Sequence, residues 1–176
     1  MCKMLFIGTK TELQEVPFDK EHPRFYVEKI SGDFLLIKHA FQNPYIYFVG
    51  TSRGCSCDFG IKLNKRSADV LSEVYPIQKV FNKIRKVAGT YEQWEECHQK
   101  RINKLLDEQA DYLSQTVRLI DLIEQKVQQE GPVELYCVWA GDYEAAPEIR
   151  NTIDFKRTDL REDFEIDERE LIVFTG

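Results

Sequence analysis

Five short apolar runs, separated by polar turn residues, predict β-strands along this chain. Each run is rich in aromatic and β-branched residues, and Gly, Pro, Asn or Ser residues lie between the runs and end regular structure. The five predicted strands cover residues 2–7, 24–30, 45–49, 133–139 and 170–174. Residues 33–42 carry Phe34, Ile37 and Phe41 at helical spacing. We expect a short helix or turn there, with its aromatic face packed on the sheet.

Between the third and fourth strands the apolar period changes to that of a helix. Residues 67–88 fit one helix, which Pro76 is expected to interrupt. A second helix is predicted from Thr90, because Thr90 and Gln93 have the spacing of a capping box. It runs to residue 129 without Gly or Pro, and apolar residues recur along it every seven positions at Leu106, Leu113, Ile120 and Val127.

The length of this second helix constrains the architecture. About 38 helical residues span roughly 57 Å, which exceeds the width of a globular domain of this size. We expect residues 67–88 to pack on it as a helical hairpin, and a homodimer contact along residues 91–129 is the alternative. The predicted fold class is α+β: one mixed or antiparallel sheet, covered on one face by helices, with the hairpin inserted between strands. Residues 1–176 are predicted to form a single domain, with the insertion at about 67–129.

Charge argues against one broad class of partners. The chain has 176 residues with a net charge of −6 and a pI of about 5.2, whereas proteins that bind nucleic acids use basic surfaces to contact phosphates. Charge is also segregated: residues 62–87 hold seven basic and two acidic residues, and residues 142–170 hold eleven acidic and five basic ones. These runs predict either solvated faces or a surface that docks a protein partner.

Cysteine usage and hydropathy bear on location. Five cysteines is an odd number, so at least one thiol cannot pair within the chain. No apolar run approaches the roughly 18 residues of a membrane helix, and the apolar run near the start is too short for a signal peptide. We therefore expect a reduced, cytoplasmic protein without membrane contact.

The most distinctive motif is the loop at residues 50–60, which carries Cys55 and Cys57 directly after a predicted strand. Two thiols one residue apart can be drawn together by a turn, and Gly54 permits the sharp backbone that such a turn needs. Thiolates are ligands for soft ions such as Zn²⁺ or Cu(I), and a structural zinc site takes four of them. The predicted metal ligands are Cys2, Cys55, Cys57 and Cys137, gathered at one end of the sheet, with zinc as the candidate ion.

Other interpretations of these cysteines remain open at this stage. Free cysteines are often buried and behave as small apolar residues, and Cys97 and Cys137 fit that pattern. Cys55 and Cys57 are also candidates for thiol redox chemistry. The start Met1-Cys2 resembles that of N-terminal nucleophile hydrolases, but no pocket motif accompanies it. The common phosphate, dinucleotide and serine-hydrolase motifs are absent from the sequence, so no catalytic residue is predicted.

Several segments together resemble a family of bacterial proteins. They are the Met1-Cys2 start, residues 23–27, the run at 45–50, the Gly-Cys-Ser-Cys-Asp loop and residues 135–142. The resemblance implies a bacterial source and carries no catalytic residue over. The function that we expect is binding of a small ligand or a protein partner by loops at the ends of the strands, and the alternative is a thiolate metal-binding or redox protein centred on Cys55 and Cys57.

Overall fold

The computed structural model describes residues 2–22, 24–59, 91–158, 160 and 164–176. The described residues form six strands, one 3-10 helix and one α-helix. In chain order these elements are β1 (Lys3–Thr9), β2 (Tyr26–Lys29), η1 (Gly32–Ala40), β3 (Tyr45–Gly50), α3 (Tyr91–Glu130), β4 (Val133–Trp139), β5 (Ile149–Asp154) and β6 (Glu170–Thr175).

The six strands form one mixed sheet in the order β2-β3-β1-β4-β6-β5. All neighbouring strands are antiparallel except β5 and β6, which run parallel. The α+β class and the mixed sheet are therefore confirmed. Strand β5 was not predicted, because its six residues include Arg150, Asn151 and Asp154 and its first four residues are exposed. An edge strand needs little apolar surface, so its sequence gives only a weak signal.

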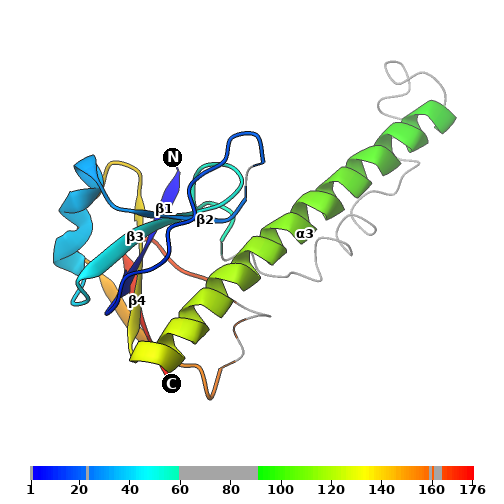
Figure 1. Ribbon diagram of the computed structural model, residues 1–176. Coiled ribbons are helices and arrows are strands. Elements are labelled where there is room, and N and C mark those ends of the chain that lie inside the picture. Colours follow the sequence, from blue (N-terminus) through cyan, green and yellow to red (C-terminus); the bar gives the residue numbers. More distant parts are fainter. Residues whose placement is uncertain (1, 23, 60–90, 159, 161–163) are drawn as a thin grey trace. The chain divides into compact units, whose positions relative to one another are not determined.

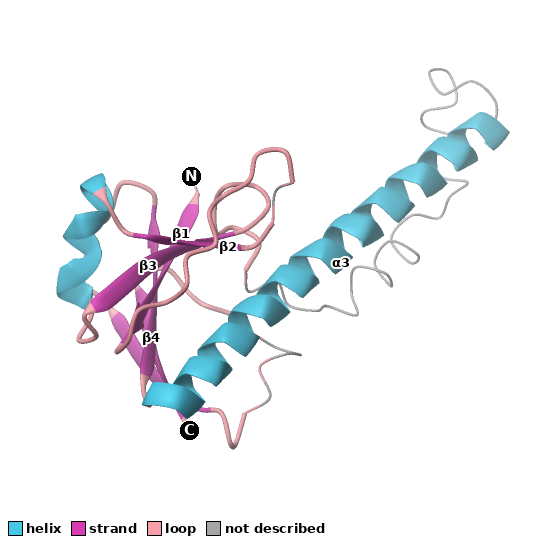
Figure 2. Ribbon diagram, in the orientation of Figure 1, coloured by secondary structure: helices cyan, strands magenta, loops and turns pink. Residues whose placement is uncertain are grey.

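Both faces of the sheet are buried, since side chains along a strand point alternately to either side. Leu5 and Ile7 of β1 belong to one core cluster, which includes residues of α3. Met4 and Phe6 belong to the other, which includes Ile37 and Ala40 of η1. Figures 1 and 2 show η1 and the C-terminal end of α3 on opposite sides of the strands. The prediction that helices cover only one face was thus wrong, whereas the expected packing of residues 33–42 on the sheet is confirmed.

The long helix exists as one uninterrupted element of 40 residues. Its last two heptad positions, Ile120 and Val127, are buried in the core beside Leu119 and Ile123. This end of α3 therefore uses its apolar stripe to cover its own sheet. The predicted partner helix at 67–88, the capping residue Thr90 and the basic run at 62–87 lie outside the described residues, so the hairpin stays a prediction.

The chain divides into two compact units, residues 1–62 with 114–176 and residues 63–113. The sheet, η1 and the part of α3 that begins at Ser114 belong to the first unit. The prediction of a single domain stays a prediction, and so does the homodimer contact along α3. All the residues of the candidate site described next belong to the first unit.

Candidate thiolate site

The loop that carries Cys55 and Cys57 begins where β3 ends, at Gly50. A Cβ atom at Gly50 would lie 2.2 Å from ring carbons of Tyr26, its partner on β2, so any larger residue there would have to displace the Tyr26 ring. The chain then folds back: the Gly54 amide donates to the Thr51 carbonyl at 2.9 Å, and the Thr51 amide donates to the Cys55 carbonyl at 2.8 Å. Gly54 has φ of 74°, a conformation that glycine adopts at little cost.

Ser56, between the two cysteines, fixes the loop to the sheet. Its side chain is buried, with 2% of the residue exposed. The hydroxyl accepts a hydrogen bond from the Leu5 amide at 2.9 Å and donates one to the Val49 carbonyl at 2.5 Å. The Ser56 amide donates to the Lys3 carbonyl at 3.1 Å. Ser56 therefore joins β1 to the end of β3, and it holds the flanking cysteines beside the start of β1.

Two further contacts anchor the loop on either side of the cysteines. Asp58 is buried, and its Oδ2 lies 2.9 Å from the Thr51 hydroxyl and 3.7 Å from Nε of Arg53. The Ser52 amide donates to Oε1 of Gln115 on α3 at 2.7 Å, and Gln115 Nε2 donates to the Ser52 hydroxyl at 3.0 Å. The loop is thus held by the sheet, by its own carboxylate and by the helix, which together fix the path of its backbone.

Three sulfur atoms meet at this place. The Sγ atoms of Cys2, Cys55 and Cys57 all lie within 4.8 Å of one another. Cys2 and Cys57 are exposed and Cys55 is half-buried. The Lys3 backbone amide donates to Sγ of Cys57 at 3.2 Å. An amide donor to a sulfur is a common outer-shell feature of metal–thiolate sites, because it stabilises charge on the thiolate.

Cys137, the fourth predicted ligand, is placed differently. It lies opposite Leu5 in the pairing of β4 with β1, and it is 1% exposed within the core. Its sulfur does not belong to the group of three. The structure therefore brings together three of the four predicted cysteines, and Cys137 packs as the small apolar residue of the alternative interpretation.

The thiol pKa values bear on reactivity. Burial raises the pKa of Cys55 to about 11; the Cys57 backbone amide opposes this shift, while the neighbouring thiols add to it. Burial also raises the pKa of Cys137 to about 11, while the positive charge of Lys3 opposes this shift. Nucleophilic and redox-active cysteines are recognised by a lowered pKa. Neither Cys55 nor Cys137 has that property, so the pKa of Cys55 gives no support to the redox interpretation of Cys55 and Cys57, which stays a prediction.

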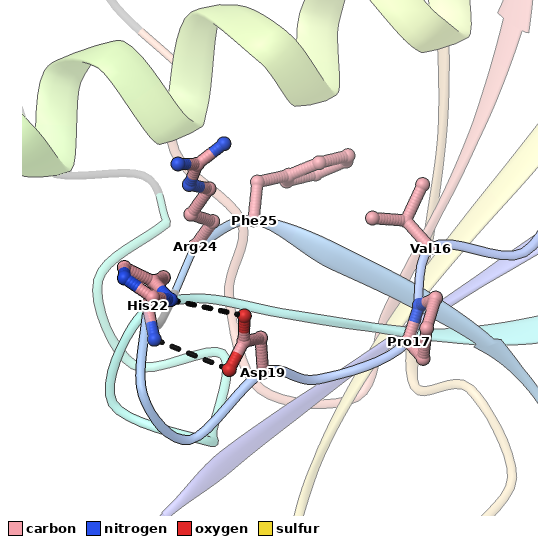
Figure 3. Close-up of a pocket in the computed structure, with 6 residues that line it drawn as sticks. All are labelled: Val16, Pro17, Asp19, His22, Arg24 and Phe25. Atoms are coloured by element: carbon pink, nitrogen blue, oxygen red, sulfur yellow. Dashed lines mark hydrogen bonds and ion pairs between the residues drawn. The ribbon is translucent and has the colours of Figure 1, made fainter.

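Elsewhere, a surface pocket lies in the loop between β1 and β2. It has a volume of about 420 Å³ and is lined by Val16, Pro17, Asp19, His22, Arg24 and Phe25. Figure 3 shows the Asp19 carboxylate turned toward His22: its Oδ2 lies 3.4 Å from Nδ1 of the ring. Hydrogen bonds from the Glu21 and His22 amides lower the pKa of Asp19. Phe25 packs edge-on against Phe59, with ring centroids 6.1 Å apart, so the pocket adjoins the cysteine loop.

Other polar side chains outside the cluster make structural contacts or are exposed. His39 connects η1 to the loop between β4 and β5, since its ring nitrogens lie 2.7 Å from the Leu36 carbonyl and 3.2 Å from the Ala145 carbonyl. Asp142 and Glu144 are both exposed. Sequence reasoning missed Ser56 and the Lys3 amide as parts of the site. No sequence signal marks either, because their roles depend on the pairing of the cysteine loop with β1.

Comparisons with known proteins identify no relative of this chain. A scan against protein-family models, a search of curated proteins and a search of solved structures gave no match to this chain. The resemblance to a bacterial family therefore stays a prediction. Among the described residues, no helix has both the length and the apolar character that crossing a membrane requires.

Proposed function

We propose that this protein binds a soft metal ion through the thiolates of Cys2, Cys55 and Cys57. The observation that carries the proposal is the meeting of three sulfurs from two distant segments, all within 4.8 Å of one another. With a metal–sulfur distance of about 2.3 Å, sulfurs lie about 3.8 Å apart in a tetrahedral site and about 4.0 Å apart in a trigonal one. Small side-chain rotations would therefore complete the site.

The exposure of two of these cysteines favours a metal site over the alternative that they only fill space in the core. A free cysteine that serves only to fill space belongs in the core, and Cys137 does this. Cys2 and Cys57 are exposed, so packing does not account for their position. The buried Ser56 beneath them and the amide donor on Cys57 support a loop shaped to present sulfur. A reducing compartment such as the cytoplasm fits this proposal, because oxidised thiols cannot ligate.

A titration of the reduced, full-length protein with Cd²⁺ tests the proposal, because cadmium–thiolate bonds absorb in the near ultraviolet. We expect saturation at one ion per chain, and loss of the absorption in the double variant Cys55→Ser/Cys57→Ser. Cys137→Ala is the matched control, since it removes a thiol outside the cluster, and it should still bind. Circular dichroism of each variant confirms that it folds. Absence of saturable absorption in the folded wild-type protein would refute the proposal.

A second candidate function is the binding of a small ligand in the pocket of the loop that connects β1 to β2. Its volume of about 420 Å³ falls within the range of small-molecule sites, roughly 300–1,000 Å³. Arg24, Val16 and Phe25 all line it, and a guanidinium together with apolar side chains suits an aromatic carboxylate. Thermal-shift measurements with a set of such carboxylates test it. Stabilisation that disappears in Arg24→Gln supports this function, and its absence throughout the set counts against it.

A further inference from the structure

The thiol cluster has three donors, and the number of donors limits which ion it suits. Within the part of the chain that the structure describes, the group contains Cys2, Cys55 and Cys57, and no histidine, carboxylate or further cysteine joins it. Structural zinc sites are almost always four-coordinate. A site with three protein sulfurs leaves a Zn²⁺ ion short of one ligand, which water must then supply.

Cys137 was the predicted source of a fourth sulfur, and the fold holds it away from the other three. Its backbone is held on both sides: it pairs with Leu5 of β1, and its carbonyl accepts a hydrogen bond from the Arg169 amide at 2.8 Å. Its side chain is in the closed core with Leu5 and Leu135. To reach the other three sulfurs it would have to leave the core, where packing density leaves little freedom to move.

Charge and coordination number favour different ions. Three thiolates carry three negative charges, so Zn²⁺ would leave one uncompensated and a monovalent ion would leave two. Charge alone therefore favours the divalent ion. Coordination number favours Cu(I), a soft ion that is satisfied by two or three sulfurs and that thiolate ligands select.

The surroundings of the cluster reduce the charge penalty of a monovalent ion. The Lys3 amide donates to Cys57 Sγ at 3.2 Å, and hydrogen bonds to sulfur stabilise thiolate charge. Two of the three sulfurs are exposed, so water screens the remaining charge.

We propose that the cluster is a three-coordinate, all-sulfur site for a monovalent soft ion of the Cu(I) type; this inference rests on the proposed function and narrows it. Cu(I) binds to Cys2, Cys55 and Cys57 in a trigonal arrangement and displaces their thiol protons. No change in oxidation state is involved. Because the site is at the surface and lacks a fourth protein ligand, the ion is open to attack by an incoming thiolate, as ligand exchange requires.

The test is a pair of competition titrations under anaerobic, reducing conditions with the full-length protein. In the first, the protein competes with a chromophoric Cu(I) chelator, and in the second with a chromophoric Zn²⁺ chelator. We expect one Cu(I) per chain to be withdrawn from its chelator, at least tenfold weaker binding in each of Cys2→Ser, Cys55→Ser and Cys57→Ser, and unchanged binding in Cys137→Ala. X-ray absorption at the copper edge should show three sulfur neighbours.

The outcomes separate this inference from the proposed function. If the protein takes one Zn²⁺ through the same three cysteines and fails to compete for Cu(I), the thiolate site stands and the monovalent assignment is overturned. If Cu(I) binds with two sulfurs, so that one of the three single variants behaves as wild type, the three-coordinate assignment is overturned. If neither ion binds to the folded, reduced protein, both proposals fail together.

Discussion

The substitution Ser56→Ala tests whether the cysteine loop is held by the hydroxyl that lies beneath it. The change removes the acceptor of the Leu5 amide and the donor to the Val49 carbonyl at a site where Ser56 is buried. A buried backbone group without a partner costs roughly 1–3 kcal/mol. With two such groups, we expect the free energy of unfolding to fall by about 3 kcal/mol. At roughly 2–4 °C per kcal/mol for a chain of this size, Tm should drop by about 6–12 °C.

The assay is urea unfolding of the metal-free, reduced protein, followed by far-ultraviolet circular dichroism. Ser52→Ala is the matched control, because Ser52 is in the same loop and also takes part in hydrogen bonds, but it is half-buried, and water can replace its contact with Gln115. It should cost less than about 1 kcal/mol. Equal stability of Ser56→Ala and Ser52→Ala would show that the buried hydroxyl does not hold the loop as we infer.

Two further predictions concern the sheet around the site. Gly50→Ala should destabilise the protein by about 1–3 kcal/mol, because a Cβ at Gly50 would collide with the Tyr26 ring. Thermal unfolding measures this cost, and the same substitution made in a Tyr26→Leu background, where the ring is absent, is the control and should cost less. Burial raises the pKa of Cys137 in the folded state to about 11, above the value of about 8.5 in an unfolded chain. The folded state therefore favours the protonated thiol, and the stability that the buried thiol contributes should be complete below pH about 8.5 and lost as the pH rises to about 11. By that pH the free energy of unfolding of the wild type should have fallen by about 3 kcal/mol relative to that of Cys137→Ala. Urea unfolding of both proteins across this pH range measures the difference, and parallel pH profiles would contradict the prediction.

Much of the fold could be predicted because its central strands have strong local signals. The fourth predicted strand, residues 133–139, coincides with β4, and the third differs from β3 by one residue. These strands are buried on both faces, so almost every position is apolar. Strand β5 was missed for the opposite reason, since its polar residues face solvent at the sheet edge. Its place is set by parallel pairing with β6, a long-range contact that leaves little trace in local sequence.

The candidate site could be predicted only in part. The motif of Cys55 and Cys57 marked the loop, and the position of Cys2 before β1 suggested that the two segments meet. Cys137 seemed equally suitable because it also lies on a strand. The deciding fact is the register of β4 with β1, which sets Cys137 opposite Leu5 and therefore in the core. Register depends on how whole strands align, so the sequence alone could not separate the three surface thiols from the buried one.

The separation of Cys2 from Cys57 along the chain has a thermodynamic consequence. They lie fifty-five positions apart, so an ion held by both would act as a reversible cross-link that encloses the first three strands. By the chain-entropy treatment of disulfides, tethering a segment of that length disfavours the unfolded ensemble by about 4 kcal/mol. Loading such an ion would therefore stabilise the N-terminal half of the sheet against unfolding, and slower proteolysis between β1 and β3 would report its occupancy.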